Sequence, residues 1–121
     1  MKVELIEKDG VRILECAEPI ARVEDALDVV SASYEHRAHG LLVESRNLPP
    51  AFFDLRSGFA GDVVQKLVNY QIRLAGVFAS EEGYTERFRE FLREARRGSH
   101  FRVFADRSDA EAWLAARAEN R

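Results

Sequence analysis

Two short runs at the start of the chain are rich in residues that favour β-strands. They cover residues 3–7 (VELIE) and residues 11–15 (VRILE). Asp9 and Gly10 lie between them, and this pair favours a tight hairpin because both residues tolerate positive φ. The pattern therefore predicts an N-terminal β-hairpin.

From Val23 onward, apolar positions recur with the period of a helix, and three further segments show the same period. We expect the first helix to end at Gly40 and the second to begin near Phe59. The apolar positions that define the four helices are Ala26, Leu27, Val30, Tyr34, Phe59, Val63, Val64, Leu67, Val68, Phe88, Phe91, Leu92, Ala95, Ala112, Trp113 and Leu114.

Capping residues mark the ends of the last two predicted helices. Thr85 is placed to cap the third helix, which should end at Gly98. Ser108 and Glu111 have the spacing of a capping box, in which each side chain satisfies a free backbone N–H group of the other residue. The fourth helix should therefore begin at Ser108.

The continuous apolar run at residues 41–43 reads as a buried strand, and residues 72–78 and 101–104 read as two further strands. Residues 47–50 (NLPP) should form a loop. The resulting order is ββαβαβαβα, and alternating βα units imply parallel strands joined by right-handed crossovers. We predict one α/β domain over residues 1–121, with a mixed sheet and helices packed on it.

Composition narrows the function classes. The chain has 121 residues and a net charge of −3, so it carries no overall attraction for nucleic acid. Cys16 is the single cysteine, which excludes an intrachain disulfide and fits a reducing compartment. No apolar run approaches the roughly 20 residues of a membrane span, and the charged start does not resemble a signal peptide. We expect a cytoplasmic protein.

Ligand sites in open α/β sheets lie beyond the carboxyl ends of the parallel strands. In this chain those ends lead into Glu44, Ser45, Ser80, Glu81 and Asp106. The segment FFDLRSGFAG, residues 52–61, starts from the same edge and combines aromatic, acidic, basic and glycine residues. It is the place where a site is expected on geometry alone.

Within this segment, Ser57 is positioned to cap the second helix. A helix N-terminus attracts anions, and Arg56 adds a full positive charge, so a phosphate bound or attached at Ser57 would be stabilised. The plainer interpretation is that Ser57 is only a cap, that Gly58 and Gly61 allow close helix–sheet packing, and that Asp54 and Arg56 are solvated or paired.

The element order, with Phe53-Asp54, Ser57-Gly58-Phe59 and Gly61 opening the second helix, resembles the STAS domain of anti-sigma-factor antagonists. The resemblance implies a regulatory protein-binding module in which Ser57 is phosphorylated by a partner kinase. This chain departs from the family pattern because Leu55-Arg56 replaces a single serine. A longer similarity, over FFDLRSGFAGDVVQKLVNYQIRLA and RGSHFRVF, is to a bacterial family called domain of unknown function 4180, which implies no assigned activity.

A contact surface is a further expectation. An extended chain would expose either Phe52 or Phe53, next to a polar helix face that carries Asp62, Lys66, Asn69 and Tyr70. Such a surface would suit a protein partner, a kinase or regulator, or a second copy of the chain. Burial of both rings by a curled loop is the alternative.

The second function considered is a small-molecule binder or enzyme, with Glu44, Asp54, Arg56 and Ser57 lining a crevice in which Arg56 holds an anion. We expect no cofactor and no catalytic set, because Ser57, His100 and Asp54 do not form a hydrolase elbow. His36 and His39 alone are too few ligands for a metal, and Cys16 is expected in the core. The arginines of the third helix should pair with glutamates three residues before them, a self-paired face rather than a nucleic-acid site.

Overall fold

The computed structural model describes the backbone of residues 1–119 and the side chains of residues 1–116. Its strands are β1 (Val3–Lys8), β2 (Val11–Cys16), β3 (Gly40–Glu44), β4 (Arg73–Val77) and β5 (Phe101–Phe104). Its helices are α1 (Asp25–His36), α2 (Pro50–Phe53), α3 (Phe59–Asn69), α4 (Glu86–Ala95) and α5 (Arg107–Glu119), with the single-turn 3₁₀ helices η1 (Ser45–Asn47) and η2 (Leu55–Ser57).

The five strands form one mixed sheet in the order β1-β2-β3-β4-β5. β1 pairs with β2 antiparallel, and every other neighbouring pair is parallel. Asp9 and Gly10 adopt φ values of 53° and 80°, which are the positive values that a two-residue hairpin turn requires. The predicted N-terminal hairpin and mixed sheet are confirmed.

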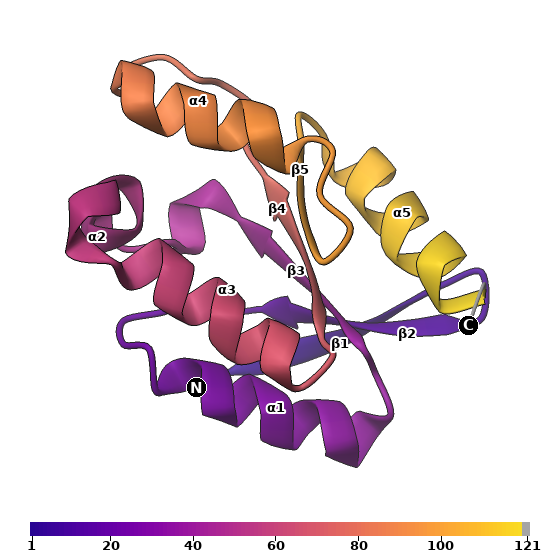
Figure 1. Cartoon of the computed structure of the whole chain (residues 1–121). Coiled ribbons are helices and arrows are strands. Elements are labelled where there is room, and N and C mark those ends of the chain that lie inside the picture. The colour runs from indigo at the N-terminus through magenta and orange to yellow at the C-terminus, as the bar shows by residue number, and fades with distance from the viewer. Residues whose placement is uncertain (120–121) are drawn as a thin grey trace.

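Helices cover both faces of the sheet, as Figure 1 shows. Each strand after β2 is added on the same side of its predecessor, so right-handed crossovers place α1, α3 and α4 on one face. α5 covers the other face. Alternate strand residues serve the two layers: Leu41 packs with α1 and α3, whereas its neighbour Leu42 packs with Leu114 of α5.

An aromatic cluster closes the end of the sheet beside α2 and α4. Phe52 is 1% exposed and meets the rings of Phe53, Phe88 and Phe91 edge-on at centroid distances of 6.0–6.4 Å. Edge-to-face pairs add about 0.5–1.5 kcal/mol each beyond the burial of their apolar area. This cluster fixes α2 against the rest of the molecule.

The first helix ends earlier than predicted. α1 stops at His36, and Arg37 closes it in the left-handed conformation with φ of 55°. Gly40 is instead the first residue of β3, where an added Cβ would lie 3.0 Å from Leu114 Cδ2. Gly40 therefore allows close packing between β3 and α5. The role of ending the first helix, which was expected of Gly40, belongs to Arg37.

Helix caps agree with the sequence in one case and differ in another. Thr85 Oγ1 accepts a hydrogen bond from the Phe88 N–H at 3.1 Å, as predicted. The predicted Ser108 cap is wrong, because Asp106 Oδ1 accepts from the Asp109 N–H at 2.9 Å and α5 starts at Arg107. Starting there lets α5 bury Ala110 and Leu114 against the sheet.

Two further expectations on loops change. α4 ends at Ala95 rather than at Gly98. The stretch predicted as a loop over residues 47–50 ends η1 and opens α2, since Pro50 occupies the first turn of that helix, where the missing N–H costs nothing.

Candidate functional site

The segment 52–61 begins inside a short helix, α2, rather than at the end of a strand. α2 ends at Phe53, η2 follows at once, and Gly58 turns the chain into α3 with φ of 78°. That left-handed conformation favours glycine, so Gly58 has a clear backbone role. Gly61 has none of this kind: a Cβ added there would have open space around it, which rules out the close packing proposed for it.

Ser57 holds the two sides of this turn together. Its hydroxyl donates to the Ala51 carbonyl oxygen at 2.7 Å and accepts from the Phe59 N–H at 3.1 Å. The N-cap position of α3 is Gly58, one residue later than predicted. The Ser57 side chain nevertheless satisfies the first free N–H group of the helix, and it lies exposed.

Asp54 and Arg56 pair locally. Asp54 Oδ1 accepts from the Arg56 N–H at 3.2 Å and lies 3.5 Å from Arg56 Nε. Both side chains are more than half exposed, and ion pairs of this kind contribute about 0–1 kcal/mol. Arg56 can therefore turn to another anion at little cost in stability.

A cavity of about 460 Å³ opens beside this turn. It is lined by Phe53, Asp54, Leu55, Arg56, Thr85 and Arg87. Its walls come from η2 and from the start of α4, and Phe53 stacks on Tyr84 with centroids 5.3 Å apart. A lining that combines the apolar side chains of Phe53 and Leu55 with the guanidinium groups of Arg56 and Arg87 suits a partly apolar group that carries a negative charge.

The expected exposed aromatic is absent from this surface. Because α2 is helical, Phe52 points into the core, and Phe53 is half-buried against Phe78 and Phe88. The alternative in which a curled segment buries both rings is correct. Phe52 therefore packs in the core against Phe53, and of the two rings only that of Phe53 lines the cavity.

Lys66, Asn69 and Tyr70 do not join the same surface. They lie about two to three turns beyond the start of α3, which at about 1.5 Å per residue separates Asn69 from the helix start by roughly 15 Å. Asn69 accepts a hydrogen bond from Gln65 at 2.8 Å, and with Tyr70 it lines a different hollow next to Tyr34 of α1.

Glu44 lies on the opposite face of the sheet from Ser57. It pairs with Arg46 at 2.8 Å and lies 3.9 Å from Arg107, which starts α5. Arg107 binds both carboxylate oxygens of Glu15 at 2.5 and 2.6 Å and Glu111 at 2.7 Å. The crevice predicted from Glu44, Asp54, Arg56 and Ser57 is therefore not formed.

This arginine–carboxylate network was missed from the sequence. The hydrogen bonds that Arg107 donates to Glu15, together with the one that it donates to Glu111, raise the pKa of Arg107 above its ordinary value against the opposing effect of burial. A usable signal was present, since Glu15 and Glu44 end neighbouring strands and Arg107 follows β5. Its evident action is to fasten α5 to the sheet.

Cys16 and the metal-ligating side chains remain to be placed. Burial raises the pKa of the Cys16 thiol to about 12, so this thiol is an unreactive core group. Across the described part of the chain, no three metal-ligating side chains come together. Within that same part, no helix is both long and apolar enough to cross a bilayer.

The arginines of α4 pair differently from the prediction. Arg93 approaches Glu86 at 3.8 Å, and Arg96 pairs with Glu81 outside the helix. Neither pair has the predicted spacing of three residues. The pattern is nonetheless that of a partly self-neutralised face.

Comparison with protein families finds a match over residues 8–114 to the family described as Domain of unknown function (DUF4180). The match covers β2, β3, β4 and β5 in full but only the last residue of β1, and it includes the turn at Ser57. A comparison with curated proteins finds no match.

Proposed function

The chain belongs to this domain-of-unknown-function family, whose description assigns no activity, so a function has to be inferred from the geometry of the structure. We propose that the protein is a non-enzymatic regulatory module that binds an acidic segment of a protein partner. The observation that supports this is the cavity lined by Phe53, Leu55, Arg56 and Arg87, beside the exposed Ser57. The proposal includes a STAS-like architecture, which the ββαβαβαβα order supports, and a role in the cytoplasm.

Charge and shape make this cavity suitable for a partner. Two arginines, Arg56 and Arg87, and one carboxylate, Asp54, line the cavity, so the charged lining residues have a net positive charge. Guanidinium groups bind carboxylates and phosphates through paired hydrogen bonds. The Arg56 side chain is 83% exposed. If it turned toward a partner, it would give up its weak ion pair with Asp54, which contributes little to stability.

The test is affinity capture from the native cells with three versions of the full chain. Wild type and Arg97→Glu, an exposed control at the far end of α4, should retain the same partner. The double variant Arg56→Glu/Arg87→Glu should lose it, because like charges now face the acidic segment. Equal capture by all three versions would contradict the proposal.

Ser57 is proposed as the switch of this contact. A phosphoryl group would add about −2 charge beside Arg56 and remove the hydroxyl that donates to Ala51. It would compete for Arg56 and loosen the turn, so partner binding should weaken. Ser57→Asp should then bind less partner than Ser57→Ala, and peptide mass spectrometry of the native protein should find the phosphate. Equal binding by both variants would exclude the switch.

A small anionic ligand is the second candidate for the same cavity. The cavity volume of about 460 Å³ favours this candidate, since small-molecule pockets commonly measure roughly 300–1,000 Å³. In a thermal-shift screen of carboxylated and phosphorylated compounds, a ligand of this site should stabilise wild type and fail to stabilise Arg87→Gln. A screen without any saturable shift would remove this candidate.

A further inference from the structure

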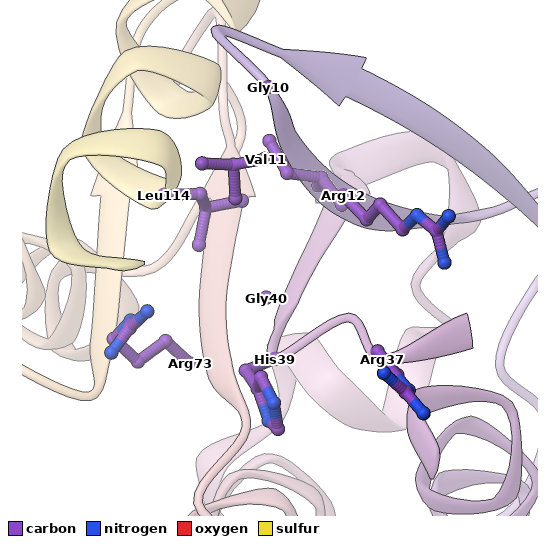
Figure 2. A pocket seen from close by; sticks show the side chains of 9 residues that line it. Gly10, Val11, Arg12, Arg37, His39, Gly40, Arg73 and Leu114 are labelled. Carbon is purple, nitrogen blue, oxygen red and sulfur yellow. The ribbon is translucent and has the colours of Figure 1, made fainter. Parts of the chain in front are cut away.

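A second cavity lies at the opposite edge of the sheet, where β3 and β4 begin. It measures about 410 Å³ and is lined by Gly10, Val11, Arg12, Ile13, Arg37, His39, Gly40, Arg73 and Leu114. Three arginines and one histidine stand among these nine described residues, and none of the nine is Asp or Glu. Figure 2 shows Arg73 on one side of Gly40, next to Leu114, and Arg12 and Arg37 on the other side.

Arg73 places a positive charge in a poorly solvated position. It is the first residue of β4, and only 8% of it is exposed. Its backbone N–H donates to the His39 carbonyl oxygen at 2.9 Å, which fixes its position next to the cavity. A guanidinium group has five N–H donors, so Arg73 can contact a ligand in this cavity in addition to the contacts that it makes within the protein.

Arg37 occupies a conformation that its side chain does not favour. Its φ of 55° lies in the left-handed region, where glycine or asparagine would be more stable by about 1 kcal/mol. The conformation ends α1, and glycine would serve that purpose without this cost. Here the strained residue is an exposed arginine whose side chain lines the cavity.

Arg12 is held on the same side as Arg37. Its Nη1 donates to the His36 carbonyl oxygen at 3.1 Å, at the C-terminal end of α1. Glu7 approaches its Nε only to 3.9 Å, and the Arg12 side chain is 49% exposed, so this pair is weak. The other guanidinium nitrogen atoms can serve a ligand.

We propose that this cavity binds a small molecule carrying two phosphoryl groups, one held by Arg73 and the other by Arg12 and Arg37. Gly10 and Gly40 add no side chains to its wall, and Val11, Ile13 and Leu114 supply apolar contact between the two cationic sides. This site differs from the cavity beside Ser57 in its location, its residues and its ligand.

The probe is pyrophosphate, added to the full chain at constant ionic strength, with the melting temperature and titration calorimetry as readouts. Wild type should show a saturable rise in melting temperature. Arg37→Gly should be as stable as wild type or more stable without the probe, because glycine accepts this φ. Its affinity for pyrophosphate should fall about tenfold, as expected for the loss of one charge-assisted contact.

Two further variants and one further anion make the outcome decisive. Arg12→Gln should also weaken binding, whereas Arg87→Gln, in the cavity beside Ser57, should bind like wild type. Citrate at the same concentration should stabilise less than pyrophosphate. The proposal fails if wild type shows no saturable rise, if citrate acts equally, or if Arg37→Gly and Arg12→Gln bind pyrophosphate unchanged. In that last case the arginines only serve the C-terminal end of α1.

Discussion

At the scale of single residues, Ser57 is both the candidate switch and a structural contact. Its hydroxyl joins the end of α2 to the start of α3 through two hydrogen bonds. The sequence indicated that this serine serves the helix start. It gave no sign of the bond to Ala51, because that bond depends on the turn of α2 that precedes it.

Ser57→Ala should lower the free energy of unfolding by about 1 kcal/mol, the usual cost of losing a helix-start side chain. Urea unfolding of the full chain measures the change. Ser108→Ala is the matched control, since Asp106 rather than Ser108 caps α5, and it should change stability by less than about 0.5 kcal/mol. A Ser108 effect as large as that of Ser57 would contradict the assignment of the two caps.

Asp25 is a residue whose charge supports the fold. Its carboxylate accepts hydrogen bonds from the Ala21 N–H at 2.8 Å and the Arg22 N–H at 3.0 Å. Burial acts to raise the pKa of Asp25, but these two hydrogen bonds and the nearby Arg22 outweigh burial and lower it. A carboxyl with a lowered pKa stabilises the fold most when it is ionised in both the folded and unfolded states.

Asp25→Ala should therefore destabilise the protein by about 1–2 kcal/mol at pH 7. The gap between variant and wild type should stay constant down to about pH 4, the ordinary range for an unfolded carboxyl, and narrow as the pH falls further through the folded pKa. Unfolding curves at pH 7, 5 and 3 provide the measurement. A gap that remains constant down to pH 3 would show that the carboxylate charge contributes nothing.

At the scale of elements, two glycines show how differently one residue type can act. An added Cβ on Gly98, between α4 and β5, would lie 1.8 Å from the Phe101 carbonyl oxygen, and a backbone atom cannot simply move aside. An added Cβ on Gly61, inside α3, would meet nothing within 4 Å. The sequence assigned a packing role to Gly61 and only a helix end to Gly98.

Gly98→Ala should destabilise the protein by more than about 2 kcal/mol, because the connection between α4 and β5 has to shift. Gly61→Ala should stabilise it by about 0.5–1 kcal/mol, the gain of removing a glycine from a helix interior. Thermal unfolding of both variants checks the pair. If Gly61→Ala is destabilising, α3 is under a constraint that its surroundings do not reveal.

The existence of the elements could be predicted from hydrophobic period, but several of their ends could not. The hairpin was predicted because Asp9 and Gly10 carry the turn signal locally. The end of α1 was missed because Arg37 takes a left-handed conformation that its type disfavours, whereas Gly40 is needed against Leu114, a contact 74 positions away in sequence. Signals of the second kind are visible only in three dimensions.

At the scale of the whole molecule, α5 contacts a strand that lies far away in the sequence, β2. Arg107 at the start of α5 contacts Glu15 across 92 residues of sequence. The site prediction failed for Glu44 for a related reason. Sequence gives the edge of the sheet at which a strand ends, but the alternation of side chains places Glu44 on the face of α5 and away from Ser57.

Arg107→Met should lower the free energy of unfolding by about 1–2 kcal/mol, because Glu15, with 13% of its side chain exposed, loses its partner. Arg107→Lys should recover part of the loss, since one ammonium group replaces a paired contact. Arg93→Met removes an exposed pair with Glu86 and should cost less than about 0.5 kcal/mol. Equal effects of the Arg107 and Arg93 changes would show that the network adds nothing.

The sequential order of the strands has a consequence during synthesis. Each strand can join the growing sheet as soon as it leaves the ribosome, because its neighbour has already been made. α5, however, follows every strand in the sequence, so Ile13, Leu42 and Ala75 stay exposed on their face of the sheet until this helix emerges. A nascent chain that has released its strands but not yet α5 therefore presents an apolar surface to chaperones.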